Sequence, residues 1–366
     1  MSRFKPTPKI GSDKYGEKGL FTSSSFQSAN IARSDRRILE IAANHSLSAK
    51  TWSSYNTVKN MLELCENQTS KDMTLPMNEG QTLSFIAWLV KRGLKARSIN
   101  SYLSGLRMLH LTQGVELRNL RSELVKQVIE GQIHIDSINN RLDKKQSRLP
   151  VTPTILKLLK MELKDSGLSK EEKRLLWSVS TIAFAGGFRV GELLARVEAS
   201  FDPLFTLLGE DVKLVTLTIK QERVETIQIK IKSQKTDRIG VDCIIDVYES
   251  NGAICPVSAY KKWRATTSVS DRNLPAFSRE DGRPLTSARF NKYLKSLLGK
   301  HIDYTGGAIT GHSFRAGIAS LLGNLGYSDV DIQSVGRWSS RAFEAYLKLP
   351  RTKRVEMARK IGEING

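Results

Sequence analysis

Two short segments pair a basic side chain with a second polar group at helical spacing. In residues 184–194, FAGGFRVGELL, Arg189 precedes Glu192 by three positions. In TGHSFR, His312 precedes Arg315 by the same spacing. Because side chains at i and i+3 share one helix face, a carboxylate can orient the Arg189 guanidinium, whose planar fork matches two phosphate oxygens. His312 and Arg315 can bind one anion at a helix N-terminus. Taken singly, a surface Arg–Glu pair is the simpler explanation of the first segment, and a structural histidine explains the second equally well.

Three further side chains could complete chemistry on a phosphodiester. Lys235 lies in IKIKSQKTDRIG, between two runs of β periodicity, where a lysine can reach a ligand and protonate a leaving alkoxide. Trp338 carries an indole N–H, a donor that does not titrate. Tyr346 follows eight residues later and becomes a nucleophile once its phenol is deprotonated. In isolation, a solvated loop lysine and a core aromatic packed on Phe343 are simpler interpretations.

The charge of the chain indicates a polyanionic partner. The 366 residues carry 57 Lys and Arg against 37 Asp and Glu, a formal net charge of +20. Residues 1–150 hold 23 basic and 13 acidic side chains, and the remainder hold 34 and 24, so the excess is shared equally. This distribution favours nucleic acid bound by both parts of the chain. A generically basic protein, such as a ribosome-associated one, is the alternative.

Other classes of protein have little support in the sequence. No apolar run approaches a membrane span, and the first residues lack a signal-peptide core, so we expect neither a membrane nor a secreted protein. Cys65, Cys243 and Cys255 are far apart and form no CxxC pattern, which argues against a disulfide framework or a zinc site. No P-loop motif and no clustered acidic motif occurs, so we expect no ATP, metal or other cofactor.

The hydrophobic pattern predicts a mainly α fold with a small antiparallel sheet (α+β) in its second part. Residues 1–32 are expected to be a flexible arm, 33–135 a bundle of four or five helices, and 136–150 a basic linker. Residues 151–366 are expected to contain helices near 153–166 and 171–186, two or three short strands between 214 and 244, and helices again from Pro256.

The order of the candidate residues resembles that of the tyrosine recombinase (phage integrase) family. The matching side chains, in chain order, are Arg189, Lys235, His312-x-x-Arg315, Trp338 and Tyr346. The resemblance covers roughly residues 35–366 and is most specific in GHSFRAG and GRWSS–AFEAYLK. Trp338 stands where most members have His, and its spacing to Tyr346 is one residue shorter than the commonest. These departures leave the subfamily open, with similarity to recombinases of eukaryotic mobile elements.

The resemblance implies a helical core-binding (SAM-like) domain followed by a catalytic domain that cleaves and rejoins DNA without metal or ATP. Tyr346 would attack a phosphodiester to give a 3′-phosphotyrosyl link and a free 5′-hydroxyl. Arg189 and Arg315 would bind the non-bridging oxygens, with Glu192 orienting Arg189. His312 would assist proton transfer, Trp338 would donate a hydrogen bond to one oxygen, and Lys235 would protonate the 5′-oxygen.

Basic clusters outside this set are candidates for contacts to the DNA backbone. Four of them lie between two predicted helices: Lys91, Arg92, Lys95 and Arg97. Three more lie in the expected linker: Lys144, Lys145 and Arg148. By family analogy, the helix after Arg97, including Arg107, would read bases.

The resemblance implies double-stranded DNA and further copies of this chain as partners, in a tetramer on two DNA sites, inside a cell. Residues 351–366 place Val355, Ala358 and Ile361 on one stripe, which would fold back in cis or dock on a neighbouring subunit. Three alternatives stay open: a type IB topoisomerase, a DNA-binding regulator that has lost cleavage, and a basic RNA-binding protein. The last is the weakest, because no aromatic RNA-binding platform is evident.

Overall fold

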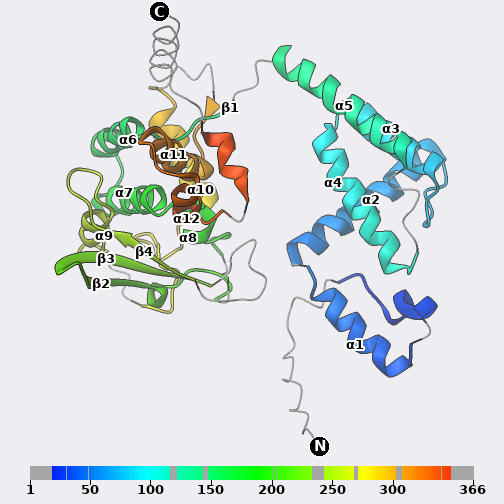
Figure 1. The fold of residues 1–366 in the computed structure, drawn as a ribbon, viewed down its shortest axis with the longest axis horizontal. Helices are drawn as coiled ribbons and strands as arrows, with labels where there is room; N and C mark the ends of the chain where they lie inside the picture. The colour runs from blue at the N-terminus through cyan, green and yellow to red at the C-terminus, as the bar shows by residue number, and fades with distance from the viewer. Residues whose placement is uncertain are drawn as a thin grey trace, which may run out of the picture. The chain divides into compact units, whose positions relative to one another are not determined.

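The chain divides into two compact units, Met1–Lys144 and Lys145–Gly366, each with its own hydrophobic core (Figure 1). The computed structural model describes residues 19–29, 31–47, 49–115, 122–142, 147–199, 201–203, 205–232, 243–267, 271–301, 307–338 and 340–347.

The described part of the first unit is built from five α-helices. They are α1 (Arg33–Asn44), α2 (Ala49–Thr69), α3 (Glu79–Lys91), α4 (Ala96–Thr112) and α5 (Glu123–Leu142). The apolar faces of α2 to α5 meet in a core that includes Leu62, Phe85 and Leu106, as the predicted helical stripes require. Helix α4 comes so close to α2 at Gly105 that any β-carbon there would collide with the Val58 side chain. By contrast, Ile38 on α1 is 66% exposed.

The expected linker starts too early, because α5 continues to Leu142. Asp136, which we placed at the beginning of the linker, belongs to the helical unit. Its Oδ2 accepts a hydrogen bond from the backbone N–H of Ala96 at 2.7 Å, and its Oδ1 accepts one from Gln132 at 3.1 Å. Since the first N–H groups of a helix lack partners within that helix, Asp136 supplies the cap that Lys95 at the N-cap position does not.

The expected arm also ends earlier than residue 32. A 3₁₀ helix, η2, runs over Ser23–Ala29. Before it, Phe21 exchanges two backbone hydrogen bonds with the Asn44 side chain, at 2.9 and 3.0 Å, and its ring lies 5.9 Å from that of Trp52. Aromatic burial, invisible to a search for helical periodicity, attaches this segment to α1 and α2. Residues 1–18 lie outside the described ranges.

The second unit is an α+β arrangement around a small sheet. Strands β2 (Val212–Ile219), β3 (Glu222–Ile231) and β4 (Cys243–Tyr248) form an antiparallel sheet in the order β2-β3-β4. Its helices are α6 (Pro153–Asp165), α7 (Lys170–Ala185), α8 (Val190–Leu193), α9 (Pro256–Arg264), α10 (Ser287–Leu298), α11 (Gly311–Asn324) and α12 (Asp329–Gly336). Two 3₁₀ turns, η4 (Gly209–Asp211) and η5 (Arg341–Tyr346), and a short parallel pair, β1 (Ser147–Arg148) with β5 (Gly307–Ala308), complete it.

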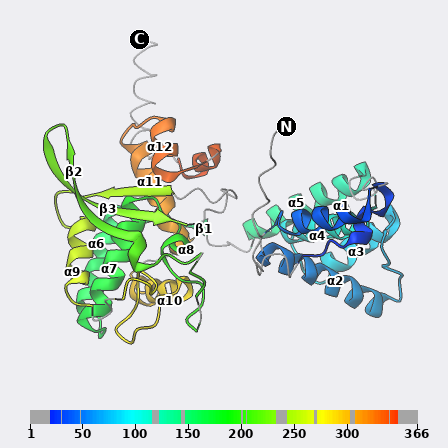
Figure 2. The same cartoon turned by 90° about the horizontal axis from the view of Figure 1, so that it is seen from below.

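Helix α7 is the central element of this unit. It packs beside α6 and α9, as Figure 2 shows, and against α11. Ser169 caps its N-terminus by accepting from the N–H of Glu172, and its C-terminal half is buried from Ser178 to Phe184. The predicted helices near 153–166 and 171–186 and the small antiparallel sheet are confirmed. Because α7 ends in the core of the second unit, the residues that follow it are surrounded by several other elements of that unit.

Among the described residues, no helix has the length and apolar character that a membrane crossing requires.

Candidate active site

The pair Gly186-Gly187 directly follows α7 and forms the first turn of the candidate site. Gly187 has φ +57°, in the left-handed region, and a β-carbon there would lie 3.1 Å from the carbonyl oxygen of Val335. Glycine therefore serves both the turn and the close approach of the end of α12. Directly after the turn, Phe188 is fully buried and Arg189 takes the N-cap position of α8.

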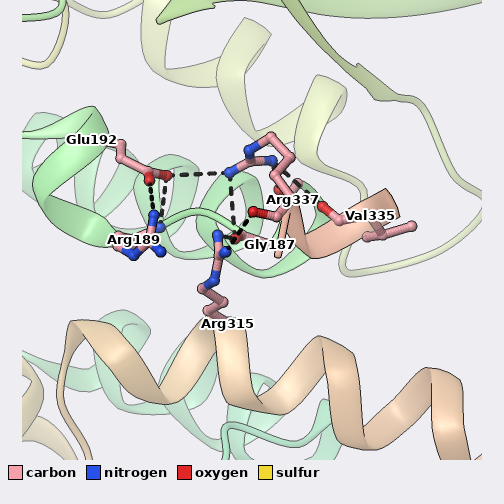
Figure 3. Close-up of polar contacts among 7 residues, drawn as sticks. Gly187, Arg189, Glu192, Arg315, Val335 and Arg337 are labelled. Carbon is pink, nitrogen blue, oxygen red and sulfur yellow. Dashed lines mark hydrogen bonds and ion pairs between the residues drawn. The ribbon is translucent and has the colours of Figure 1, made fainter. Parts of the chain in front are cut away.

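Arg189 and Glu192 form the contact that their spacing predicts. The Nη1 of Arg189 lies 2.7 Å from Oε1 of Glu192, and the backbone N–H of Arg189 donates to Oε2 at 2.9 Å (Figure 3). The Glu192 side chain is 9% exposed and that of Arg189 is 26% exposed. The carboxylate is held by its own helix start, so it can fix the direction of the guanidinium.

Arg315 occupies the second turn of α11 and is 3% exposed. Its Nη1 donates to the carbonyl oxygen of Gly187 at 2.9 Å, and its Nη2 donates to the carbonyl oxygen of Arg337 at 3.3 Å (Figure 3). Its Cζ lies 4.4 Å from the ring centroid of Trp338. Backbone dipoles and an aromatic face thus help to compensate the burial of the cation.

Arg337 is the functional candidate that the sequence analysis missed. It ends α12 in the left-handed conformation, with φ 52° and ψ 48°, which is uncommon for a residue with a side chain. Its Nη1 donates to the carbonyl oxygen of Gly186 at 2.7 Å, and its Nη2 lies 3.1 Å from Oε2 of Glu192. The guanidinium also stacks on Phe188, 4.7 Å from the ring centroid.

The electrostatics of Arg337 reflect this position. Burial lowers the pKa of its guanidinium, while the Glu192 carboxylate opposes that shift. A smaller effect that raises the pKa comes from Cys243, so the first residue of β4 lies near this group. An arginine stays protonated at neutral pH even after a sizeable downward shift, so Arg337 is a fixed cation.

These contacts bring three guanidinium groups together at the glycine turn, and two of them, those of Arg189 and Arg337, bind the Glu192 carboxylate. Glu192 lies between Arg189 and Arg337, and Arg315 reaches the same glycine turn from α11 (Figure 3). The cluster carries a net formal charge of +2 in a largely desolvated setting. Such a site favours an anion, and it holds its donors in place before the anion arrives. The arginines come from the ends of three helices that are distant in the sequence.

Trp338 connects this cluster to the element that carries Tyr346. Its ring lies 4.4 Å from Cζ of Arg315 and 5.8 Å from the ring of Phe343. Phe343 is fully buried in η5, together with Ala319 of α11. Where the sequence analysis expects helix in this C-terminal part, Arg341–Tyr346 form a 3₁₀ turn, and the Ser340 side chain at its N-cap makes no capping hydrogen bond. The backbone of Tyr346 ends this turn, and its side chain lies outside what the structure describes.

The remaining two candidates are placed only in part. His312 is an exposed residue in the first turn of α11, one turn before Arg315, as its spacing predicts. Lys235 belongs to residues 233–242, between β3 and β4, outside the described ranges. The catalytic roles of all these residues stay predictions.

The candidate DNA contacts of the first unit are at exposed positions, except Lys95, which is half-buried. Arg92 follows α3 and stacks on Trp88 at 4.8 Å. Arg97 and Arg107 lie on one exposed face of α4, with polar side chains between them, and Lys95 stands at its N-cap. Lys91 is exposed at the end of α3. Lys144 and Lys145 lie outside the described ranges, as does the side chain of Arg148.

Within the described ranges, His, Cys, Asp and Glu side chains form no group of three or more that could hold a metal ion.

Comparisons with known proteins support the fold at low sequence identity. No family model and no curated protein matches the sequence. The structure resembles that of the XerH site-specific recombinase bound to a palindromic difH substrate, with a TM-score of 0.55, 14% identity, and coverage of 90% of this chain and 85% of that chain. It also resembles the Tn1549 transposon integrase in complex with a circular intermediate DNA, with a TM-score of 0.55, 14% identity, and coverage of 88% and 97%.

A third similar structure is a lambda integrase dimer bound to a core site, with a TM-score of 0.52, 16% identity, and coverage of 85% and 75%. All three are recombinases or integrases of one structural class. The chain therefore has the tyrosine recombinase fold, which confirms the resemblance at the level of architecture.

Proposed function

We propose that this protein is a tyrosine site-specific recombinase, which cleaves and rejoins double-stranded DNA through a 3′-phosphotyrosyl intermediate. The observation that carries the proposal is the arginine cluster, in which Arg189 and Arg337 pair with Glu192 and Arg315 donates to the backbone of Gly187 and Arg337. A site with this charge suits a phosphodiester, whose negative charge increases as a fifth oxygen attacks. The three DNA-bound proteins of the same fold point to the same substrate class.

In the proposed reaction, the Tyr346 oxygen forms a bond to phosphorus as the bond from phosphorus to the 5′-oxygen breaks. The phenol, with a pKa of about 10 in water, must lose its proton, which His312 would help to accept. Lys235 would give a proton to the departing 5′-oxygen. Arg189 and Arg315 would bind the two non-bridging oxygens. Attack of a 5′-hydroxyl on the phosphotyrosine reverses these steps and rejoins the strand.

The helical unit would bind the duplex through the basic residues around the start of α4, and the second unit would carry out the chemistry. Recombination exchanges strands between two duplexes, so we propose a tetramer on two DNA sites, acting on a mobile element inside a cell. A monomer that relaxed plasmids without sequence preference would instead indicate a topoisomerase.

The decisive experiment traps the covalent intermediate. Full-length protein is incubated with nicked duplexes of randomised sequence, so that the short released fragment, which carries the free 5′-hydroxyl, diffuses away and the adduct accumulates. We expect a protein–DNA adduct on a denaturing gel, with mass spectrometry placing the modification on Tyr346. Tyr346→Phe should abolish the adduct and retain DNA binding, whereas Tyr327→Phe, at an exposed tyrosine, should retain both. An adduct on Tyr346→Phe would reassign the nucleophile.

A further inference from the structure

Helices α6, α7 and α9 enclose a groove of about 480 Å³ in the second unit, which we name the three-helix groove. Figure 2 shows these helices side by side. Trp177, which lines it, is about two and a half turns before Gly186, or about 13 Å along the helix axis. The groove is therefore separate from the arginine cluster at the end of α7.

The floor of the groove is apolar. It is formed by Met161, Leu163, Trp177 and Ala259. Met161 is 50% exposed, and Trp177 is only partly buried, so the floor presents a flexible thioether and an aromatic face to solvent. Methionine and tryptophan are residues that adapt to and anchor apolar side chains of a partner.

The rim of the groove is basic on every side. Its six cations are Lys157, Lys160, Lys164, Lys173, Arg174 and Lys262. No carboxylate is among the described residues that line the groove. The contacts recorded for the rim cations are to neutral groups: Lys173 donates to the carbonyl oxygen of Lys164 at 3.0 Å, and Arg174 to that of Lys262 at 3.1 Å. Lys160 lies over the Trp177 ring at 5.3 Å.

The apolar floor and the basic rim together favour one kind of occupant for the groove. Nucleic acid would satisfy the cations and leave the apolar floor without a partner, because its backbone presents phosphates and sugars. The chain's own ends have the wrong charge: residues 1–18 and 351–366 each carry five basic and two acidic side chains. A helix with carboxylates flanking an apolar stripe complements both floor and rim.

We propose that the three-helix groove binds an acidic amphipathic helix of a partner protein. Large apolar side chains at i, i+3 or i+4, and i+7 would pack on Met161 and Trp177. Flanking Asp and Glu side chains would pair with the lysines of α6 and the cations of α7. Because the groove is separate from the arginine cluster, such a partner could bind while DNA occupies the site.

The test measures binding of a fluorescent synthetic helix, with Leu and Phe on one face and Glu elsewhere, to the full-length protein by anisotropy. Lys157→Glu with Lys164→Glu should weaken binding by about tenfold or more, because two attractive contacts become repulsive. Lys213→Glu with Arg223→Glu makes the same charge change at exposed sites on β2 and β3, and should alter affinity by less than about twofold. Circular dichroism and thermal unfolding verify that both variants fold.

Two further arms examine the floor and the nature of the occupant. Met161→Glu should lower the affinity for the synthetic helix by about tenfold. A polyglutamate peptide of equal charge should bind more weakly than the amphipathic helix. Equal binding of the two peptides, or equal binding by both double variants, would overturn the proposal. So would a loss of duplex DNA affinity confined to the α6 variant, which would make the groove a DNA surface. Concentration-dependent self-association in sedimentation that the α6 variant alone loses would also overturn it, with a second copy as the occupant.

Discussion

The two units treat charged side chains in opposite ways. In the described part of the first unit, the buried polar residues are neutral or need no charge: Ser25, Asn44, Thr82 and His110. His110 accepts from the N–H of Met77 at 2.9 Å through Nε2 and contacts the carbonyl oxygen of Leu106 through Nδ1, which a neutral ring satisfies. The second unit buries ionisable groups, including Arg315 and Glu162.

This difference corresponds to the two tasks that the proposed DNA substrate would impose. Exposed cations attract phosphates and release counterions, and they gain little from a fixed position. Cations that stabilise a transition state work best when desolvated and held in place beforehand. We therefore expect substitutions in the first unit to change affinity and its salt dependence, and substitutions in the arginine cluster to change the rate of strand cleavage.

The largest effect is expected at Arg315. Arg315→Lys keeps a charge and loses the planar fork, so Gly187 and Arg337 lose donors and the phosphate loses a bidentate partner. The single-turnover rate of cleavage should fall by about 10²–10³-fold. Arg97→Lys, the same change at an exposed site of α4, should alter that rate by less than about twofold at saturating DNA. Comparable losses in both variants would remove the distinction between the units.

The second-largest effect is expected on the salt dependence of DNA binding. Replacing Lys91, Arg92 and Arg97 together by Gln should reduce the slope of log affinity against log salt by up to about 2.7, at about 0.9 per phosphate contact. Between 50 and 200 mM salt, this corresponds to a change of about 40-fold in relative affinity. Fluorescence anisotropy with a duplex at several salt concentrations measures the slope. An unchanged slope would show that these residues are solvated charges away from the DNA.

Arg337 is the point where sequence reasoning and structure diverge most. Arg189 and Glu192 lie within one turn of a helix, and so do His312 and Arg315. Spacing alone therefore predicts the proximity of each pair. Arg337 contacts Gly186 and Glu192 across about 150 positions, from a left-handed residue that periodicity does not anticipate. Its only signal in the sequence is its place between Gly336 and Trp338.

The boundaries of the helices show the same limit of prediction from the sequence. The helix over Lys170–Ala185 follows from its capping serine and apolar face, and the prediction is accurate to one residue. The end of α5 could not be predicted, because Asp136 is polar and is kept in the bundle by the N–H of Ala96, forty positions earlier. Phe21 likewise joins the helical unit through its contacts with Asn44 and Trp52 rather than through a local pattern.

A third prediction tests Arg337 itself as a positioning residue. Lysine cannot reach both the Gly186 carbonyl and Glu192, so Arg337→Lys should leave Arg189 less well oriented. We expect cleavage to slow by about tenfold, equivalent to about 1.4 kcal/mol of barrier, with DNA affinity within about twofold of wild type. Arg283→Lys, at an exposed position, serves as the control. A matched loss of affinity and rate would indicate a role in binding rather than positioning.

A fourth, smaller effect examines the boundary of the helical unit. Asp136→Ala removes the acceptor for Ala96 and should lower the free energy of unfolding of this unit by about 1 kcal/mol. Hydrogen exchange at the first turn of α4 should accelerate more than exchange elsewhere in the unit. Asp136→Asn keeps a side-chain oxygen and should cost less. Unchanged exchange at Ala96 would mean that Asp136 is part of the linker after all.

The smallest effect is a pH dependence that belongs to the second unit alone. Glu162 of α6 is 6% exposed and pairs with Lys300, at 2.8 Å, and with His301. The hydrogen bond from Lys300 is the main cause that holds the pKa of this carboxyl below its ordinary value. A depressed carboxyl pKa contributes stability above the ordinary value, about 4.3 for glutamate, and that stability is lost as the pH falls through the folded pKa. Between about pH 6 and pH 3, the melting temperature of the second unit should therefore fall more steeply in wild type than in Glu162→Gln.

Glu280→Gln, at an exposed glutamate, should follow the wild-type curve. Parallel curves for wild type and Glu162→Gln would mean that this pair adds nothing to the acid sensitivity of the unit.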